Sequence, residues 1–183
     1  MAWNDTNLIK VLKKEGVAVM PTDTLYGIVG RAEDKDVVER IYRVRKRNPA
    51  KPCIVLVGDI NEIHKFGIPL SLEQEEEIEK YKEPTSFILD CSLERFEYLH
   101  RGTETLAFRI PRQIELKNLL KETGPLVAPS ANPEGLTPAQ NIVEAKKYFG
   151  DLVDLYIDGG EIKGKASKVV KLHKDGSVTI LRE

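Results

Sequence analysis

The chain has only two cysteines and three histidines among its 183 residues. Cys53 and Cys91 each lie inside an apolar run and form no C-x-x-C pair, which favours buried thiols in a reducing compartment over a disulfide. The histidines, His64, His100 and His173, form neither an H-x-x-x-H nor an H-E-x-x-H pair. We therefore expect no metal site, and no serine or cysteine hydrolase that depends on a histidine base.

Long apolar runs and an excess of one charge are also lacking. No apolar run approaches the roughly 18 residues that span a bilayer. The N-terminal MAWNDTNLIK has no signal-peptide core, so we expect a cytoplasmic protein without a membrane partner. The 28 Lys and Arg residues nearly balance the 29 Asp and Glu residues, and the formal net charge is −1. Overall charge thus indicates no particular partner, and only local clusters could bind one.

Helical and strand patterns alternate along the chain, which predicts one α/β domain over residues 1–183. Helices are expected over 5–14, 34–47, 71–81, 113–123 and 137–150, and another from Asp59 onward. Strands are expected over 17–20, 53–57, 86–90, 105–110, 126–130 and 153–158, followed by a hairpin of 168–173 and 177–182. This order predicts a single twisted mixed β-sheet with flanking helices and an antiparallel end.

Local signals predict the limits of two helices. Ser71 followed by Gln74 is a capping-box pattern at the start of the helix over 71–81. For the last helix, Thr137 is the expected cap, Pro138 the first helical residue and Gly150 the terminator.

The segment PTDTLYG, residues 21–27, follows the first expected strand. In open α/β sheets, ligands lie outside the carboxyl ends of strands. Pro21 is expected to end the strand, while the hydroxyls of Thr22 and Thr24 could meet a ligand. Gly27 lets the backbone approach that ligand closely.

Two further polar features lie near strand ends. Ser130 and Asn132 follow the strand over 126–128 and could hydrogen-bond a ligand, although a simple polar turn is the alternative. In TLAFRI, Arg109 shares one face of the strand with Thr105 and Ala107. A cation beside such small residues suggests a carboxylate or phosphate partner, and a cross-strand salt bridge is equally possible.

A cluster of six cations lies between residues 40 and 51, namely Arg40, Arg43, Arg45, Lys46, Arg47 and Lys51. On the helix predicted over 34–47, Arg40, Arg43 and Arg47 fall on one outward face. Arg45 instead continues the apolar ridge, so its guanidinium is expected on the covered side, where it would be costly without a partner. We interpret the cluster as an anion or phosphate site, with surface charge that complements the helix dipole as the alternative.

Taken together, these motifs resemble the YrdC-like threonylcarbamoyl-AMP synthases. The pattern of that family is P-T-[DE]-T-x-Y-G, K-x-R, R-x-P and S-x-N, which this chain carries as PTDTLYG, RKR, RIP and SAN, with a late SKVV. The resemblance covers roughly residues 5 to 183. It implies the YrdC-like fold and synthesis of L-threonylcarbamoyladenylate from L-threonine, bicarbonate and ATP with release of pyrophosphate. That product supplies the formation of threonylcarbamoyladenosine in tRNA.

The resemblance also implies roles for ten residues. The catalytic residues would be Arg45 and Arg47. ATP would be bound by Arg47, Lys51, Thr105, Asn132 and Arg182. Threonine would be bound by Thr24, Arg109, Ser130 and Ser167, with Arg109 holding its carboxylate. Mg²⁺ would arrive with ATP rather than in a dedicated metal cage, and proteins that modify tRNA would act downstream.

The chain departs from the family pattern at several positions. Arg45 stands where lysine is usual, Lys168 where threonine is usual, Leu56 where many members carry histidine, and Ser86 where threonine is usual. A relative without synthase activity that binds RNA or nucleotide is therefore the alternative. Direct RNA binding is not favoured, because the net charge is −1 and only the aromatic Tyr42 interleaves the cations.

Overall fold

The computed structural model describes residues 2–183. Its strands are β1 (Ala18–Pro21), β2 (Tyr26–Arg31), β3 (Ile54–Leu56), β4 (Thr85–Asp90), β5 (Thr105–Arg109), β6 (Leu126–Val127), β7 (Leu155–Tyr156), β8 (Lys168–Leu172) and β9 (Val178–Arg182). Over the described residues they form one nine-stranded sheet in the order β7-β1-β2-β6-β3-β5-β4-β8-β9. Parallel and antiparallel pairs both occur, so the predicted mixed α/β sheet with an antiparallel end is confirmed.

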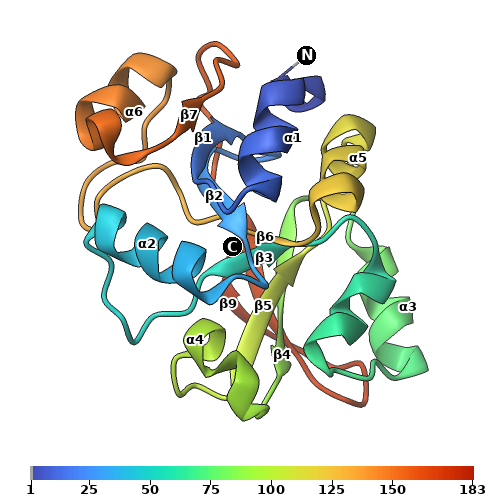
Figure 1. Ribbon diagram of the computed structural model, residues 1–183. Helices are drawn as coiled ribbons and strands as arrows, with labels where there is room; N and C mark the ends of the chain where they lie inside the picture. The colour runs from blue at the N-terminus through green and yellow to red at the C-terminus, as the bar shows by residue number, and fades with distance from the viewer. Residues whose placement is uncertain (1) are drawn as a thin grey trace.

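Helices flank this sheet (Figure 1). The α-helices are α1 (Thr6–Lys13), α2 (Lys35–Arg45), α3 (Leu72–Lys80), α4 (Glu97–His100), α5 (Ile114–Thr123) and α6 (Ile142–Phe149). The 3-10 helices are η1 (Ala2–Asn4), η2 (Ile60–Phe66), η3 (Glu94–Phe96) and η4 (Gly150–Leu152). The capping box of Ser71 and Gln74 is present at the start of α3, as predicted. No helix among residues 2–183 is long and apolar enough to cross a membrane.

The strands bury apolar side chains on both faces of the sheet, because successive residues point to opposite sides. One face packs in a core that includes Ile28 and Val55, and this core also takes in Ile41 of α2. The other face packs Val29 and Leu56 in a second core. That second core is completed by leucines of α1 and α5, namely Leu8, Leu12, Leu116, Leu119 and Leu120.

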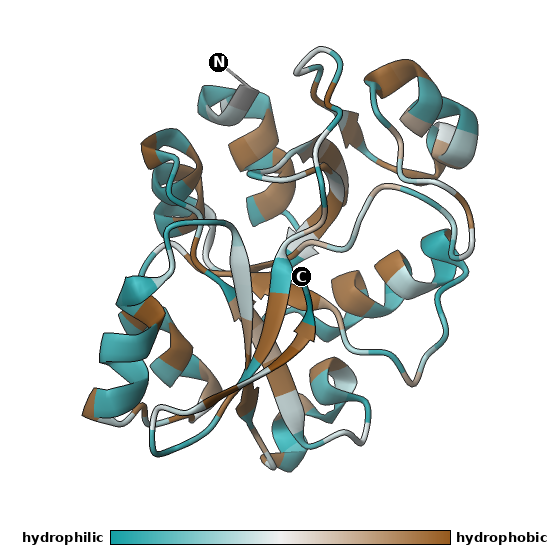
Figure 2. Cartoon of the chain, turned by 180° about the vertical axis from the view of Figure 1, so that it is seen from behind, coloured by the Kyte–Doolittle hydropathy of each residue, from teal (hydrophilic) through white to brown (hydrophobic). Residues whose placement is uncertain are grey.

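Helices α1 and α5 cover only part of that second face. Next to them, β2, β3, β5, β4 and β8 contribute five small or apolar residues to a hollow instead, namely Gly27, Ile54, Ala107, Ile88 and Val169. In Figure 2, which shows the molecule from behind, the strands beside the C-terminus lie in front with no helix over them. The open part of the sheet is therefore the place where a ligand could lie.

Between residues 17 and 66 the structure confirms two predicted features and corrects two others. Pro21 is the last residue of β1 and pairs with Tyr26, so it ends the strand as predicted. Residues 26–31 form β2, a strand that the prediction lacks because its two glycines, Gly27 and Gly30, weaken the strand pattern. The helix expected from Asp59 onward is present as the 3-10 helix η2, with Asp59 as its cap. Helix α2 ends at Arg45 instead of Arg47, because Lys46 adopts a left-handed conformation with φ of 51°.

The last helix also begins later than predicted. Its cap is Asn141, whose side chain accepts a hydrogen bond from the backbone nitrogen of Glu144. Thr137 and Pro138 precede it in an irregular segment, and Pro138 lines the hollow. Gly150 follows the last residue of α6, as predicted. The sequence does not distinguish between the two caps, because Thr137 followed by Pro138 is as strong a helix-start signal as Asn141.

Candidate active site

The hollow is a cavity of about 600 Å³ on the open part of the sheet. Five stretches of the chain, far apart in the sequence, form most of its wall: 22–27, 47–54, 103–109, 128–130 and 166–169. Seven of the ten residues that the sequence singles out line this cavity, namely Thr24, Arg47, Thr105, Arg109, Ser130, Ser167 and Arg182. The sheet thus gathers most of the motifs at one place.

Arg47 reaches the cavity because it lies just beyond the end of α2. Its Nε donates to the carbonyl oxygen of Lys51 at 3.1 Å, and Nη2 donates to that of Pro52 at 2.7 Å. The guanidinium also lies 5.9 Å from the centre of the Tyr42 ring. These contacts hold the cation in place, so the outward helical face predicted for Arg47 is wrong.

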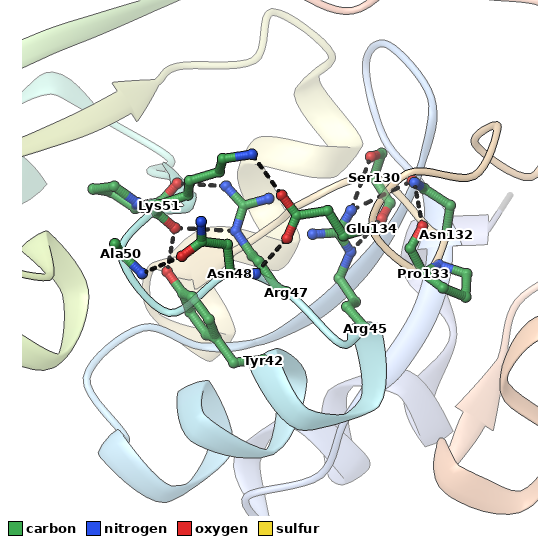
Figure 3. A network of polar contacts seen from close by, with 11 residues as sticks. Tyr42, Arg45, Arg47, Asn48, Ala50, Lys51, Ser130, Asn132, Pro133 and Glu134 are labelled. Carbon is green, nitrogen blue, oxygen red and sulfur yellow. Dashed lines mark hydrogen bonds and ion pairs between the residues drawn. The ribbon is translucent and has the colours of Figure 1, made fainter.

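Arg45 lies behind the cavity wall, not in it. Only 3% of the residue is exposed, which confirms that it points to the covered side. Its Nε donates to the carbonyl oxygen of Ser130 at 2.9 Å, and Nη2 lies 3.4 Å from the Ser130 Oγ and the Asn132 Oδ1 (Figure 3). Burial, together with the nearby charge of Arg47, lowers the pKa of Arg45 to about 10. Arg45 therefore supports the loop that carries Ser130.

Asn132 and Lys51 do not line the cavity either. Asn132 uses its Nδ2 within its own loop, donating to the carbonyl oxygens of Pro133 and Leu136 at 2.9 and 2.8 Å. Lys51 pairs with Glu134 at 2.7 Å, and the backbone nitrogen of Asn48 donates to the same carboxylate (Figure 3). The hydrogen bond from Lys51 lowers the pKa of Glu134. Glu134 thus ties the segment after α2 to the segment after β6.

Arg109 has a partner that the sequence reading did not identify. It projects from β5 beside Thr105 and Ala107 and forms an ion pair with Asp23 at 2.8 Å. Both side chains are buried, with 4% and 3% exposed. Burial lowers the pKa of Arg109, and the charge of Asp23 opposes that shift. The salt bridge that was the alternative is therefore present, but its carboxylate comes from the 21–27 motif and not from a neighbouring strand. The signal for it was an aspartate between two threonines of that motif.

Ser167 and Arg182 close the cavity on the side of β8 and β9. The Oγ of Ser167 lies 2.8 Å from the Oγ of Ser86 on β4. Arg182 donates from Nε and Nη2 to the carbonyl oxygen of Ser167, at 3.0 and 2.8 Å. The C-terminal strand thus holds the wall that carries Ser167.

The charge of the cavity has one sign. Among the residues that the structure describes, three arginines and no carboxylate line it, namely Arg47, Arg109 and Arg182. The remaining polar lining consists mainly of hydroxyl groups such as those of Thr24, Thr105 and others in the same wall. Fixed cations beside neutral hydrogen-bonding groups attract small anions. Within residues 2–183, no group of three His, Cys, Asp or Glu side chains could hold a metal ion.

The profile of the Sua5/YciO/YrdC family, described as telomere recombination, matches residues 10–183. The chain belongs to this family. A family relative, the threonylcarbamoyl-AMP synthase of Halorhodospira halophila (strain DSM 244 / SL1), is 27% identical over 150 residues, or 81% of this chain and 78% of that protein. The resemblance drawn from the motifs is thereby confirmed at the level of the family.

Two solved structures show how closely the fold agrees with other members of the Sua5/YciO/YrdC family. Sua5 of P. abyssi, in complex with L-threonine, has a TM-score of 0.87 at 25% identity and covers all of this chain. This chain spans only 54% of that protein. YciO of E. coli has a TM-score of 0.81 at 25% identity, with 97% of this chain and 87% of YciO covered.

Proposed function

We propose that this chain is a threonylcarbamoyl-AMP synthase that makes L-threonylcarbamoyladenylate from L-threonine, bicarbonate and ATP. The observation that supports this most is the cavity with three arginines and no carboxylate, since all three substrates carry negative charge. Relatives named threonylcarbamoyl-AMP synthase, and a similar structure in complex with L-threonine, agree with the proposal. In this role the product would pass to proteins that modify tRNA.

The proposed reaction needs no nucleophile from the protein. The threonine amine attacks the carbon of bicarbonate and forms a carbamate with loss of water. A carbamate oxygen then attacks the α-phosphorus of ATP, whose bond to the bridging oxygen breaks, and pyrophosphate leaves. What the protein must do is hold mutually repelling anions close together, through proximity and fixed positive charge.

The arrangement of the cavity suggests how its residues share this work. Arg109 would bind the carboxylate of threonine, while Arg47 and Arg182 would face the phosphates. Hydroxyls of Thr24, Thr105 and the two serines, Ser130 and Ser167, would hydrogen-bond the substrates. Magnesium would enter as part of the MgATP substrate, because the cavity wall offers no carboxylate to hold it separately.

Three predicted residues would act from outside the cavity wall. Arg45 and Asn132 would keep the Ser130 loop in shape rather than contact substrate. Lys51 could reach a phosphate only by leaving Glu134. The Lys51 side chain is 60% exposed, and pairs at such exposed positions are weak, so a triphosphate could displace Glu134.

The test is an assay of pyrophosphate release by the purified chain with L-threonine, bicarbonate and MgATP. Omission of threonine should abolish release, and mass spectrometry should detect threonylcarbamoyladenylate. Arg47→Ala should lower the rate at least about tenfold, since it removes a fixed charge beside the reacting phosphates. Arg43→Ala, which removes an exposed arginine of α2, is the matched control and should leave the rate unchanged. Pyrophosphate release that does not depend on threonine would refute the synthase proposal and favour a relative that only binds or hydrolyses nucleotide.

A further inference from the structure

Asp23 lies beside the candidate active site without lining it. Its carboxylate meets the Arg109 guanidinium at 2.8 Å, and its side chain is only 3% exposed. Arg109 faces the cavity of about 600 Å³, whereas Asp23 lines a neighbouring cavity of about 570 Å³. The ion pair therefore lies in the wall between two hollows, with its cation turned toward the first.

The position of the Arg109 guanidinium depends on this one contact. Among the described residues, the ion pair with Asp23 is the polar contact that this guanidinium makes, and its Nε has no hydrogen-bond partner. By contrast, two carbonyl oxygens hold Arg47, and the carbonyl oxygen of Ser167 holds Arg182. A buried guanidinium without a partner is strongly unfavourable, so it would turn or take up water if Asp23 were neutral.

We propose that Asp23 is a positioning residue for threonine: it holds Arg109 in the orientation that meets the amino-acid carboxylate. This inference deepens the proposed function and rests on it. Asp23 occupies Nη2, which leaves other guanidinium N–H groups to meet the carboxylate. It acts through Arg109 alone, because no atom of Asp23 lines the substrate cavity.

The proposal predicts different effects on the two ligands. Asp23→Asn frees Arg109 from its partner, so the dissociation constant for threonine should rise at least about tenfold, as expected for the loss of a charged contact. The same substitution removes the negative charge that pairs with Arg109, one of the three arginines of the cavity, so the cavity becomes more positive. The affinity for ATP should therefore be unchanged within about threefold, or higher. A merely structural defect would weaken both ligands together.

Calorimetric titration of the whole chain with L-threonine, and separately with a non-hydrolysable ATP analogue, tests this prediction. Asp23→Glu keeps the charge and should restore most of the threonine affinity. Asp154→Asn is the matched control, because it breaks an Asp–Arg pair with Arg40 outside the cavity and should change neither affinity. Unchanged threonine binding in Asp23→Asn, or equal loss of both ligands, would overturn the proposal. Failure of the unaltered chain to bind threonine would instead count against the proposed function.

If Asp23→Asn does not fold, a second measurement tests whether Asp23 holds the Arg109 guanidinium. In the ¹⁵N-labelled unaltered chain, the Nη groups of Arg109 should give separate signals, because a guanidinium held by an ion pair rotates slowly about its Cζ–Nη bonds. The signals are assigned by their loss in Arg109→Lys. A single averaged Nη signal in the ligand-free protein would show that Asp23 does not hold Arg109, and would overturn the proposal without reference to threonine.

Discussion

Arg45 and Arg47, which are separated by a single residue, have different environments. Arg45 is the last residue of α2 and is buried behind the Ser130 loop. Lys46 turns the chain with a positive φ, and Arg47 then emerges into the cavity. Substitutions at Arg45 and Arg47 should therefore affect different properties, stability at Arg45 and the reaction at Arg47.

We expect Arg45→Ala to lower the free energy of unfolding by about 2 to 4 kcal/mol. The substitution leaves the Ser130 carbonyl oxygen without its donor and removes the packed side chain. Arg45→Lys should fold and keep activity, because an ammonium can still donate to that carbonyl oxygen. Urea denaturation measures both effects, with Arg43→Ala as an exposed control that should change stability by less than about 0.5 kcal/mol. Full stability of Arg45→Ala would show that the buried contacts contribute nothing.

At the scale of elements, the irregular segment 158–167 crosses the 21–27 motif and brings Ser167 to the cavity. The Tyr26 hydroxyl donates to the carbonyl oxygen of Gly160 at 2.9 Å and accepts from the nitrogen of Gly159 at 2.7 Å. A Cβ on Gly164 would lie 2.0 Å from the Thr24 carbonyl oxygen, so only glycine fits there. The tyrosine of PTDTLYG thus serves to hold this segment against the motif.

Tyr26→Phe should loosen the segment 158–167 while the sheet stays folded. The substitution leaves the Gly159 nitrogen and the Gly160 carbonyl oxygen without their partner, which is unfavourable by about 1 to 3 kcal/mol. Trypsin should then cleave after Lys163 or Lys165 at least several-fold faster. Tyr156→Phe removes a similar hydroxyl contact, to the Gly150 carbonyl oxygen, and should not change that rate. Equal cleavage rates in Tyr26→Phe and the unaltered chain would contradict the tethering role.

At the scale of the whole molecule, ion pairs connect segments that are far apart in the sequence. Asp154 accepts from Arg40 of α2 at 2.6 Å, across 114 positions in the sequence, and from the Val17 nitrogen at 2.7 Å. The hydrogen bond from Arg40 holds the pKa of Asp154 below its ordinary value of 3.8. This carboxylate therefore stabilises the folded chain only while it is ionised.

The sign of the pH dependence follows from the lowered pKa. The contribution of Asp154 is fully present above pH 3.8 and is lost as the pH falls below that value through the folded-state pKa. Asp154→Asn should therefore reduce stability at pH 7 and make unfolding less sensitive to pH in that acidic range. Chemical denaturation at a series of pH values measures this effect. A parallel offset at every pH would mean that Asp154 does not titrate differently in the folded chain.

Much of the architecture could be predicted because it depends on local patterns. The run Val17–Met20, the capping box at Ser71 and the Asp-Gly turn near residue 175 each carry their own signal, and each lies in or beside the expected element. Strand β2 was missed because its glycines weaken the strand pattern. The early end of α2 was missed because Lys46 is not a residue that typically adopts a positive φ.

The sequence by itself determined the class of fold, the family and most of the polar residues that line the cavity, because periodicity and motifs are local properties. Only the tertiary structure decided that Arg47 enters the cavity while Arg45 supports its wall, that Asp23 is the partner of Arg109, and that Tyr26 holds the segment 158–167. These contacts join segments up to 134 positions apart. Which side chains meet across such distances depends on how the sheet orders its strands, and no local pattern encodes that order.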